Sequence, residues 1–107
     1  MTLFFIINYI SGNEITKISG LDPKKLARLS ELELRANKLV STAGVFLPNL
    51  KKLYLAENKI ERIEQLSKLE HLSILHLRDN NISKLDGFSD CMSNLQYLNL
   101  RWGSIFF

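Results

Sequence analysis

A pattern of leucines and an asparagine recurs three times in the middle of this chain. Leucines lie eight, five and three residues before Asn37, Asn58 and Asn80, and a leucine or isoleucine lies two residues after each. Weaker copies flank these three, one around Asn13 and one with Gly103 at the asparagine position. Repeats therefore start near residues 5, 29, 50, 72 and 95, with periods of 21 to 24 residues. Such a period indicates a tandem array of one structural unit.

The spacing of the apolar residues predicts short strands. Two leucines two residues apart point the same way from a strand, and a single repeat cannot bury that apolar face alone. Stacking the repeats would bury the leucines beneath a parallel sheet. An asparagine can hydrogen-bond backbone groups where the chain turns off each strand. We therefore assign a structural role to the repeat asparagines Asn13, Asn37, Asn58 and Asn80.

The pattern L-x-x-L-x-L-x-x-N-x-[LI] identifies the chain as a member of the leucine-rich repeat family. We expect an α/β leucine-rich repeat solenoid of about five repeats, with a short parallel concave β-sheet and an irregular or short helical convex side. Asp22 and Pro23 are suited to the cap and first position of a helix. Ser89 can cap a short helical turn, and the return with Gly44 and Pro48 should be irregular.

The length of 107 residues predicts a single leucine-rich repeat domain over 1–107. The run Leu3–Ile7 is interpreted as a buried strand, because it lacks the flanks of a signal peptide and falls short of the ~20 residues of a membrane span. Neither end carries the polar cap that terminal repeats need. We expect a portion of a longer repeat protein, with self-association through its uncapped ends. Its last residues, Phe106 and Phe107, would either cover that open edge or stay exposed.

Partner proteins are expected on the concave strand face, the usual binding surface of a repeat array. Tyr, Arg and Trp, which often dominate interface energies, recur at its outward positions. The predicted partner-binding residues are Tyr9, Glu33, Arg35, Tyr54, Glu57, His76, Arg78, Asp79, Tyr97, Asn99, Arg101 and Trp102. The alternative is that these are solvated strand residues, some paired with neighbours. Glu31 beside Lys52 is one expected cross-strand pair.

No catalytic, cofactor or metal site is predicted. His71 and His76 should face differently, and Cys91 lies on a return segment, so no metal-ligand cluster is expected. Ser73, His76 and Asp79 are close in sequence, but Ser73 and His76 should point to opposite faces of the strand. The glycines are scattered rather than grouped in a phosphate loop. We expect a non-enzymatic interaction module without a small-molecule substrate or membrane contact.

Charge and cysteine content restrict the partner class and the compartment. The net charge is +3, which falls short of the dense basic stripe of a nucleic-acid binder. The single cysteine, Cys91, excludes an internal disulfide. A reducing compartment such as the cytoplasm is therefore expected.

Several segments resemble a narrower group within the family. "GLDPKKL", "LPNLKKLYLAENKIERIEQL", "LHLRDNNISKLDGFS" and "LQYLNLR" are similar to axonemal leucine-rich repeat proteins of the ciliary radial spoke, over about residues 12–101. The resemblance implies a cytoskeletal scaffold of the cilium or flagellum, with radial-spoke or other axonemal proteins as partners. It also implies further repeats and charged extensions beyond this sequence. Where that group has Leu-Arg-Gly-Asn, this chain has Leu100, Arg101, Trp102 and Gly103.

Two alternative functions stay open at the level of the sequence. The repeat type also resembles intracellular leucine-rich repeat proteins that regulate phosphatases, which implies an adaptor role. The basic balance permits a component of an RNA–protein particle instead. Steeply salt-dependent RNA affinity would distinguish the second alternative.

Overall fold

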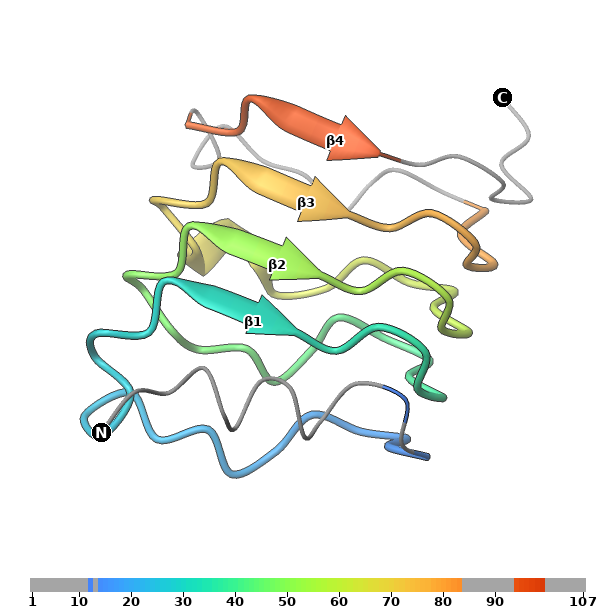
Figure 1. Ribbon diagram of the computed structural model, residues 1–107, viewed down its shortest axis with the longest axis horizontal. Helices are drawn as coiled ribbons and strands as arrows, with labels where there is room; N and C mark the ends of the chain where they lie inside the picture. The colour runs from blue at the N-terminus through green and yellow to red at the C-terminus, as the bar shows by residue number, and fades with distance from the viewer. Residues whose placement is uncertain (1–11, 13, 84–93, 100–107) are drawn as a thin grey trace.

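The computed structural model describes residues 12, 14–83 and 94–99. Its elements are β1 (Glu31–Glu33), β2 (Lys52–Tyr54), the 3₁₀ helix η1 (Leu66–Lys68), β3 (Ile74–His76) and β4 (Tyr97–Asn99). The strands form one sheet in the order β1-β2-β3-β4, and each neighbouring pair is parallel. Figure 1 shows the four strands stacked in chain order, with the connecting segments behind them. Within these residues, no helix has the length and apolar character needed to cross a membrane.

The register of the sheet follows the repeat period. Leu32, Leu53, Leu75 and Leu98 are mutual partners across the three strand pairs. The first three are 1% exposed or less, while the residues on either side of them are half-buried. A slip of one residue would turn these leucines outward, so the hydrophobic pattern fixes the register. The predicted parallel sheet is confirmed for these four repeats.

The hydrophobic core lies between the sheet and the return segments. Isoleucines and leucines of the return segments are buried where the structure describes them. They are Ile18, Ile60, Ile63, Leu66 and Ile82, with Ile15 partly buried against them. Leu85 and Phe88, which the same pattern places inward, lie outside the described residues. Each repeat thus contributes apolar side chains from both its strand and its return, as stacking of repeats requires.

Asn58 joins its own strand end to the preceding repeat. Its Nδ2 donates to the carbonyl oxygen of Leu55 in its own repeat and to that of Leu34 in the preceding one, both at 3.0 Å. Its Oδ1 accepts a hydrogen bond from the backbone N–H of Leu39 at 3.1 Å. The side chain is 8% exposed, so it supplies partners to backbone groups that water does not reach.

The other repeat asparagines make the same connection. The Oδ1 of Asn37 accepts from the N–H of Ile15 at 3.1 Å, and that of Asn80 accepts from the N–H of Ile60 at 2.9 Å. Every buried side-chain nitrogen and oxygen in the described part has a hydrogen-bond partner. Asn37, Asn58 and Asn80 thus make the backbone hydrogen bonds that their predicted structural role requires, while Asn13 lies outside the described residues.

The residue before each repeat asparagine has a left-handed backbone. Ala36, Glu57 and Asp79 have φ of 60°, 57° and 58°, and Gly12, at the equivalent position, has φ of 77°. The N–H of Ala36 donates to the carbonyl oxygen of Ala56 in the next repeat at 3.0 Å. The turn off each strand therefore uses the same conformation, although a side chain there costs about 1 kcal/mol or more relative to glycine.

The convex side, predicted to be irregular or short helical, is irregular in the described residues apart from the short η1, but the helix expected to start at Asp22 and Pro23 does not form. Residues 23–28 form turns. Asp22 does cap, because its Oδ1 accepts from the N–H of Lys24 at 2.9 Å. A single turn is closed by the N–H of Leu26, which donates to the carbonyl oxygen of Asp22. The next hydrogen bond runs from the N–H of Leu29 to the carbonyl oxygen of Leu26. Burying Leu29 within so few residues overrides the helical signal. The predicted turn at Ser89 lies outside the described residues.

Candidate interaction surface

Three aromatic side chains form a continuous stack on the outward face of β2, β3 and β4. We call this outward side of the sheet the strand face; it is the surface predicted to be concave. Tyr54 and His76 are partners in the sheet, and their ring centroids are 5.2 Å apart with planes tilted by 36°. His76 and Tyr97 are 4.9 Å apart with a tilt of 35°. Both spacings lie in the range where aromatic rings attract. Tyr97 is 46% exposed, so the stack presents apolar area to a partner.

Arg78, a predicted contact residue, is paired within the protein. Its Nη2 lies 3.3 Å from Oε1 of Glu57, and its Nη1 lies 3.3 Å from Oδ2 of Asp79. These three predicted residues therefore lie together beyond the ends of β2 and β3. The two carboxylates hold the guanidinium in place, so the alternative interpretation of neighbour pairing applies to Arg78.

The expected pair between Glu31 and Lys52 is confirmed. The Nζ of Lys52 lies 3.1 Å from Oε1 of Glu31 across β1 and β2. The hydrogen bond and charge of Glu31 raise the pKa of the Lys52 ammonium above its ordinary value of 10.5, with a smaller effect from Tyr54. The ammonium therefore stays charged and paired at neutral pH.

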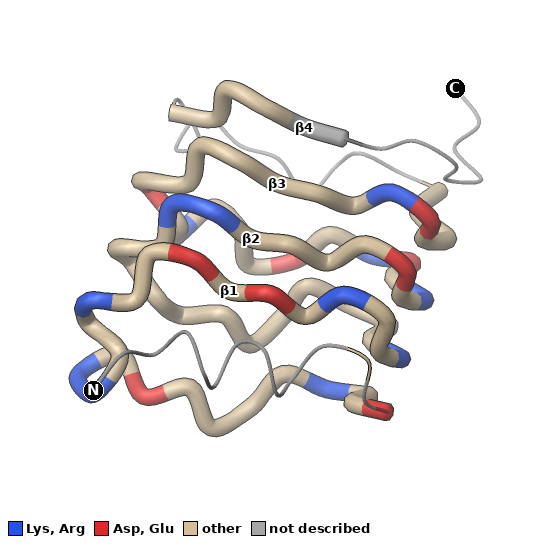
Figure 2. Tube along the Cα trace, in the orientation of Figure 1, with Lys and Arg blue, Asp and Glu red and all other residues tan. Residues whose placement is uncertain are grey.

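The strand face carries more negative than positive charge within the described part. Its carboxylates are Glu31, Glu33, Glu57 and Asp79, and its cations are Arg35, Lys52 and Arg78. Figure 2 shows residues of both signs on and beside β1, β2 and β3.

The remaining predicted contact residues have different outcomes. Glu33 accepts a hydrogen bond from the N–H of Arg35 at 2.8 Å, and Arg35 is exposed. Asn99 lies in β4. Tyr9, Arg101 and Trp102 lie outside the described residues. Ala56, which the alternation of the repeat places outward, is only 3% exposed. The chain already leaves the sheet at Ala56, where the carbonyl oxygen accepts a hydrogen bond from the N–H of Ala36.

In the described part, no cluster of three or more His, Cys, Asp or Glu side chains has the arrangement to hold a metal ion. The Ser73 hydroxyl donates to the carbonyl oxygen of Lys51 at 3.2 Å. His76 belongs to the aromatic stack. These two side chains therefore have separate structural partners.

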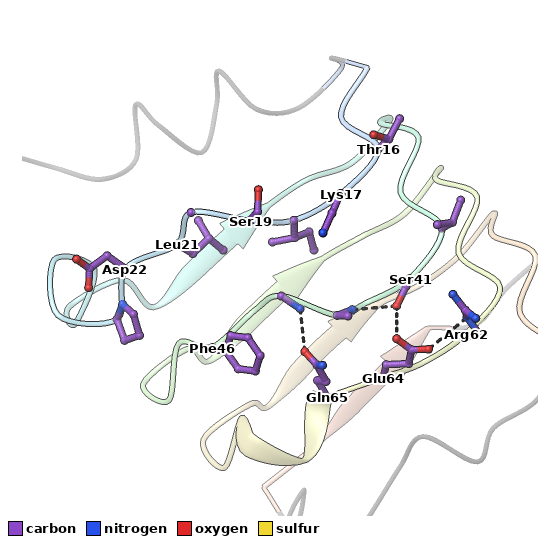
Figure 3. A pocket seen from close by; sticks show the side chains of 16 residues that line it. Thr16, Lys17, Ser19, Leu21, Asp22, Ser41, Phe46, Arg62, Glu64 and Gln65 are labelled. Carbon is purple, nitrogen blue, oxygen red and sulfur yellow. Dashed lines mark hydrogen bonds and ion pairs between the residues drawn. The ribbon is translucent and has the colours of Figure 1, made fainter.

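A groove between return segments is a surface that the sequence pattern did not reveal. It has a volume of about 800 Å³ and is lined by residues 16–23, 40–41, 43–44, 46, 62 and 64–65 (Figure 3). Val40 and Phe46, 46% and 40% exposed, lie in its walls. The signals available in the sequence were an apolar residue, Phe46, off the repeat pattern and a first return longer than the second.

Comparison with known proteins supports the repeat assignment. The family described as Leucine Rich repeats (2 copies) matches residues 48–89. Leucine-rich repeat-containing protein 23 of Bos taurus and that of Homo sapiens are each 54% identical over 92 residues, or 86% of this chain and 27% of the relative. The protein of the same name from Xenopus tropicalis is 53% identical over 90 residues, or 84% of this chain and 26% of the relative. The chain thus spans about a quarter of the length of these relatives. With the asparagine pattern and the parallel sheet, these matches confirm the resemblance of this chain to leucine-rich repeat proteins.

Proposed function

We propose that the chain is a non-enzymatic protein–protein interaction scaffold that binds a partner through the strand face. The observation that carries this proposal is the stack of Tyr54, His76 and Tyr97, held on three parallel strands and accessible at Tyr97. Rigid aromatic side chains on a regular sheet give contact area at little entropic cost.

The chemistry of the strand face favours a partner with basic side chains. The aromatic stack offers ring faces to a lysine or arginine, and the carboxylates exceed the cations around it. The same excess counts against an RNA-bound role, because a phosphate backbone would meet Glu31, Glu33 and Glu57 on this surface. No observation in the structure favours the phosphatase-regulating alternative.

The proposal includes the organisation of the whole chain. We take residues 1–107 as one solenoid domain of about five repeats with a concave strand face. The strands β1 to β4 follow the repeat starts near 29, 50, 72 and 95 and support this organisation.

The cellular setting follows from the resemblance to radial-spoke proteins. We place the chain in the axoneme of a cilium or flagellum, as a structural component that supports motility. Relatives named leucine-rich repeat-containing protein 23, at 53–54% identity, support this proposal. The chain spans about a quarter of these relatives, so its partners there would be those that contact this group of repeats.

Capture of radial-spoke proteins from a salt extract of axonemes tests the proposal. The bait is the full chain, and the variant carries Tyr54→Ala with Tyr97→Ala, which truncates the stack on both sides of His76. The control is Lys25→Ala on an exposed turn away from the strand face. We expect capture by the wild type and the control and loss in the double variant. Equal capture by all three would contradict the proposed surface, and absence of radial-spoke proteins from the wild-type capture would contradict the axonemal setting.

A further inference from the structure

The groove lies apart from the strand face. All its lining residues belong to three return segments, and none belongs to β1, β2, β3 or β4. Two of the large hydrophobic residues that are exposed in the described part, Val40 and Phe46, lie in it. The repeat pattern does not require either to be exposed, so the groove needs its own explanation.

Unequal return segments account for the opening. The first repeat period is 24 residues and the second is 21, so the first return has extra chain to accommodate. The second and third returns are joined where Lys59 N–H donates to Leu39 O and Glu61 N–H donates to Val40 O. Between the first and second returns, the described residues share one backbone hydrogen bond, from Lys38 N–H to Ile15 O. After Ile15 the described backbones of these two returns share no further hydrogen bond, and the groove opens beside Val40.

Two backbones come close together at the lining of the groove, at Gly44 and Ile18. A side-chain carbon on Gly44 would lie 2.2 Å from the carbonyl oxygen of Ile18, so only glycine permits this approach. The groove is therefore fixed by the packing of the two returns at Gly44, and it does not depend on the position of a surface side chain.

Most polar groups of the wall are already engaged. Glu64 accepts a hydrogen bond from Ser41 at 2.9 Å and pairs with Arg62 at 3.2 Å. Gln65 accepts from the N–H of Gly44 at 3.1 Å. Figure 3 shows these groups bonded to one another along one side of the groove. They define the wall, and their charges are balanced within it.

Lys17 differs from these groups. Its ammonium has no ion-pair or hydrogen-bond partner among the described residues, and Figure 3 shows it directed into the groove. The backbone N–H groups of Thr16 to Ser19 likewise make no hydrogen bond within the described part. The groove thus combines exposed apolar side chains, a lysine without a partner among the described residues, and backbone N–H groups that are likewise unpaired there; its lining also includes the carboxylate of Asp22, which accepts from the N–H of Lys24.

We propose that this groove binds an extended peptide segment of a partner protein that presents a large apolar side chain and a carboxylate. The apolar side chain would cover Phe46 and Val40, the carboxylate would pair with Lys17, and the peptide backbone would bond along Thr16–Ser19. A volume of about 800 Å³ accommodates a few residues of such a segment. This site is independent of the proposed function of the strand face.

Two pools of capped octapeptides test the proposal on the full chain. Every peptide in both pools has Phe or Leu at the fourth position. One further position is Glu in the first pool and Gln in the second, and Ser, Gly and Ala fill the remaining positions. We expect the Glu pool to shift the amide resonances of Val40, Ser41 and Gly44 and to bind about threefold to fivefold more tightly than the Gln pool. Absence of these shifts at millimolar peptide, or equal binding of the two pools, would overturn the proposal.

Matched variants assign the preference to its residue. Lys17→Glu should remove the preference for the Glu pool, whereas Lys25→Glu makes the same charge change on a turn outside the groove and should keep it. The double variant Tyr54→Ala with Tyr97→Ala should bind both pools as the wild type does, which separates this site from the strand face. Equal loss in the Lys17 and Lys25 variants would show a non-specific charge effect and contradict the assignment.

Discussion

The carboxamide of Asn58 and the backbone N–H of Leu39 are joined by a 3.1 Å hydrogen bond across 19 residues of sequence. The same asparagine donates to carbonyl oxygens on both sides of the repeat boundary. One side chain thus connects the strand end of one repeat to the return of the previous one. Stacking of the repeats depends on these connections as well as on the leucines.

Replacing Asn58 with alanine should lower the free energy of unfolding by about 3 kcal/mol, because buried backbone groups would lose their partners. The matched control is Asn49→Ala. Asn49 makes one bond, from Nδ2 to the carbonyl oxygen of Ala27, and is exposed. The control should lose less than about 1 kcal/mol, since water replaces the lost partner. Urea unfolding of both variants measures the difference, and equal losses would contradict the connecting role of Asn58.

Gly44→Ala should destabilise the chain by about 3 kcal/mol or more, because the new methyl group meets the carbonyl oxygen of Ile18. Gly20 provides the control, since its φ is also positive, at 77°, and no atom lies within 4 Å of an added side-chain carbon. Gly20→Ala should cost only the backbone term of about 1 kcal/mol. Thermal unfolding measures the melting temperature of both variants, and similar shifts in the two would contradict the close approach at Gly44.

Ala36→Gly should stabilise the chain by up to about 1 kcal/mol, because it relieves a left-handed backbone at φ of 60°. Ala27, on an exposed turn, is outside the set of positive-φ residues. Ala27→Gly should therefore destabilise by about 0.5 to 1 kcal/mol. Opposite signs in chemical denaturation are the expected result, and the same sign at both positions would contradict the assigned conformations.

The pair of Lys52 and Glu31 predicts a pH dependence at the alkaline end. Glu31 raises the pKa of Lys52 in the folded chain. The stability from the pair is therefore complete below pH 10.5 and is lost as the pH rises through the folded pKa. Urea unfolding of the wild type and of Glu31→Gln should differ most at about pH 9, and the difference should shrink as the pH rises above 10.5. A difference that does not change over this interval would contradict the pairing.

The repeated side chains explain why so much of the fold could be predicted. Leu53 and Leu75 differ in position by one period, so one stacking rule fixes their pairing and their burial. Asn58 follows the same rule, because its partners belong to the repeated backbone. The short turns at 23–28 were predicted less well, since Asp22 and Pro23 carry a local helical signal that packing against the next return overrides.

The candidate sites depend on differences between repeats, which a shared pattern does not describe. Arg78 is paired because Glu57, which follows the preceding strand, lies within reach of its guanidinium. The groove beside Phe46 exists because two consecutive returns differ in length and touch at Gly44. The strand face could be predicted as a surface, but its aromatic stack required the spacing and tilt of the rings.

Site-specific photocrosslinking tests the central claim, binding of a partner protein through the strand face, most directly. A photoreactive phenylalanine at position 54 lies in the aromatic stack, and one at position 61 replaces an exposed return residue, Glu61. In ciliated cells that express the full chain, position 54 should crosslink to an axonemal protein with basic segments, and position 61 should not. Crosslinks from position 61 alone, or from neither position, would contradict the claim.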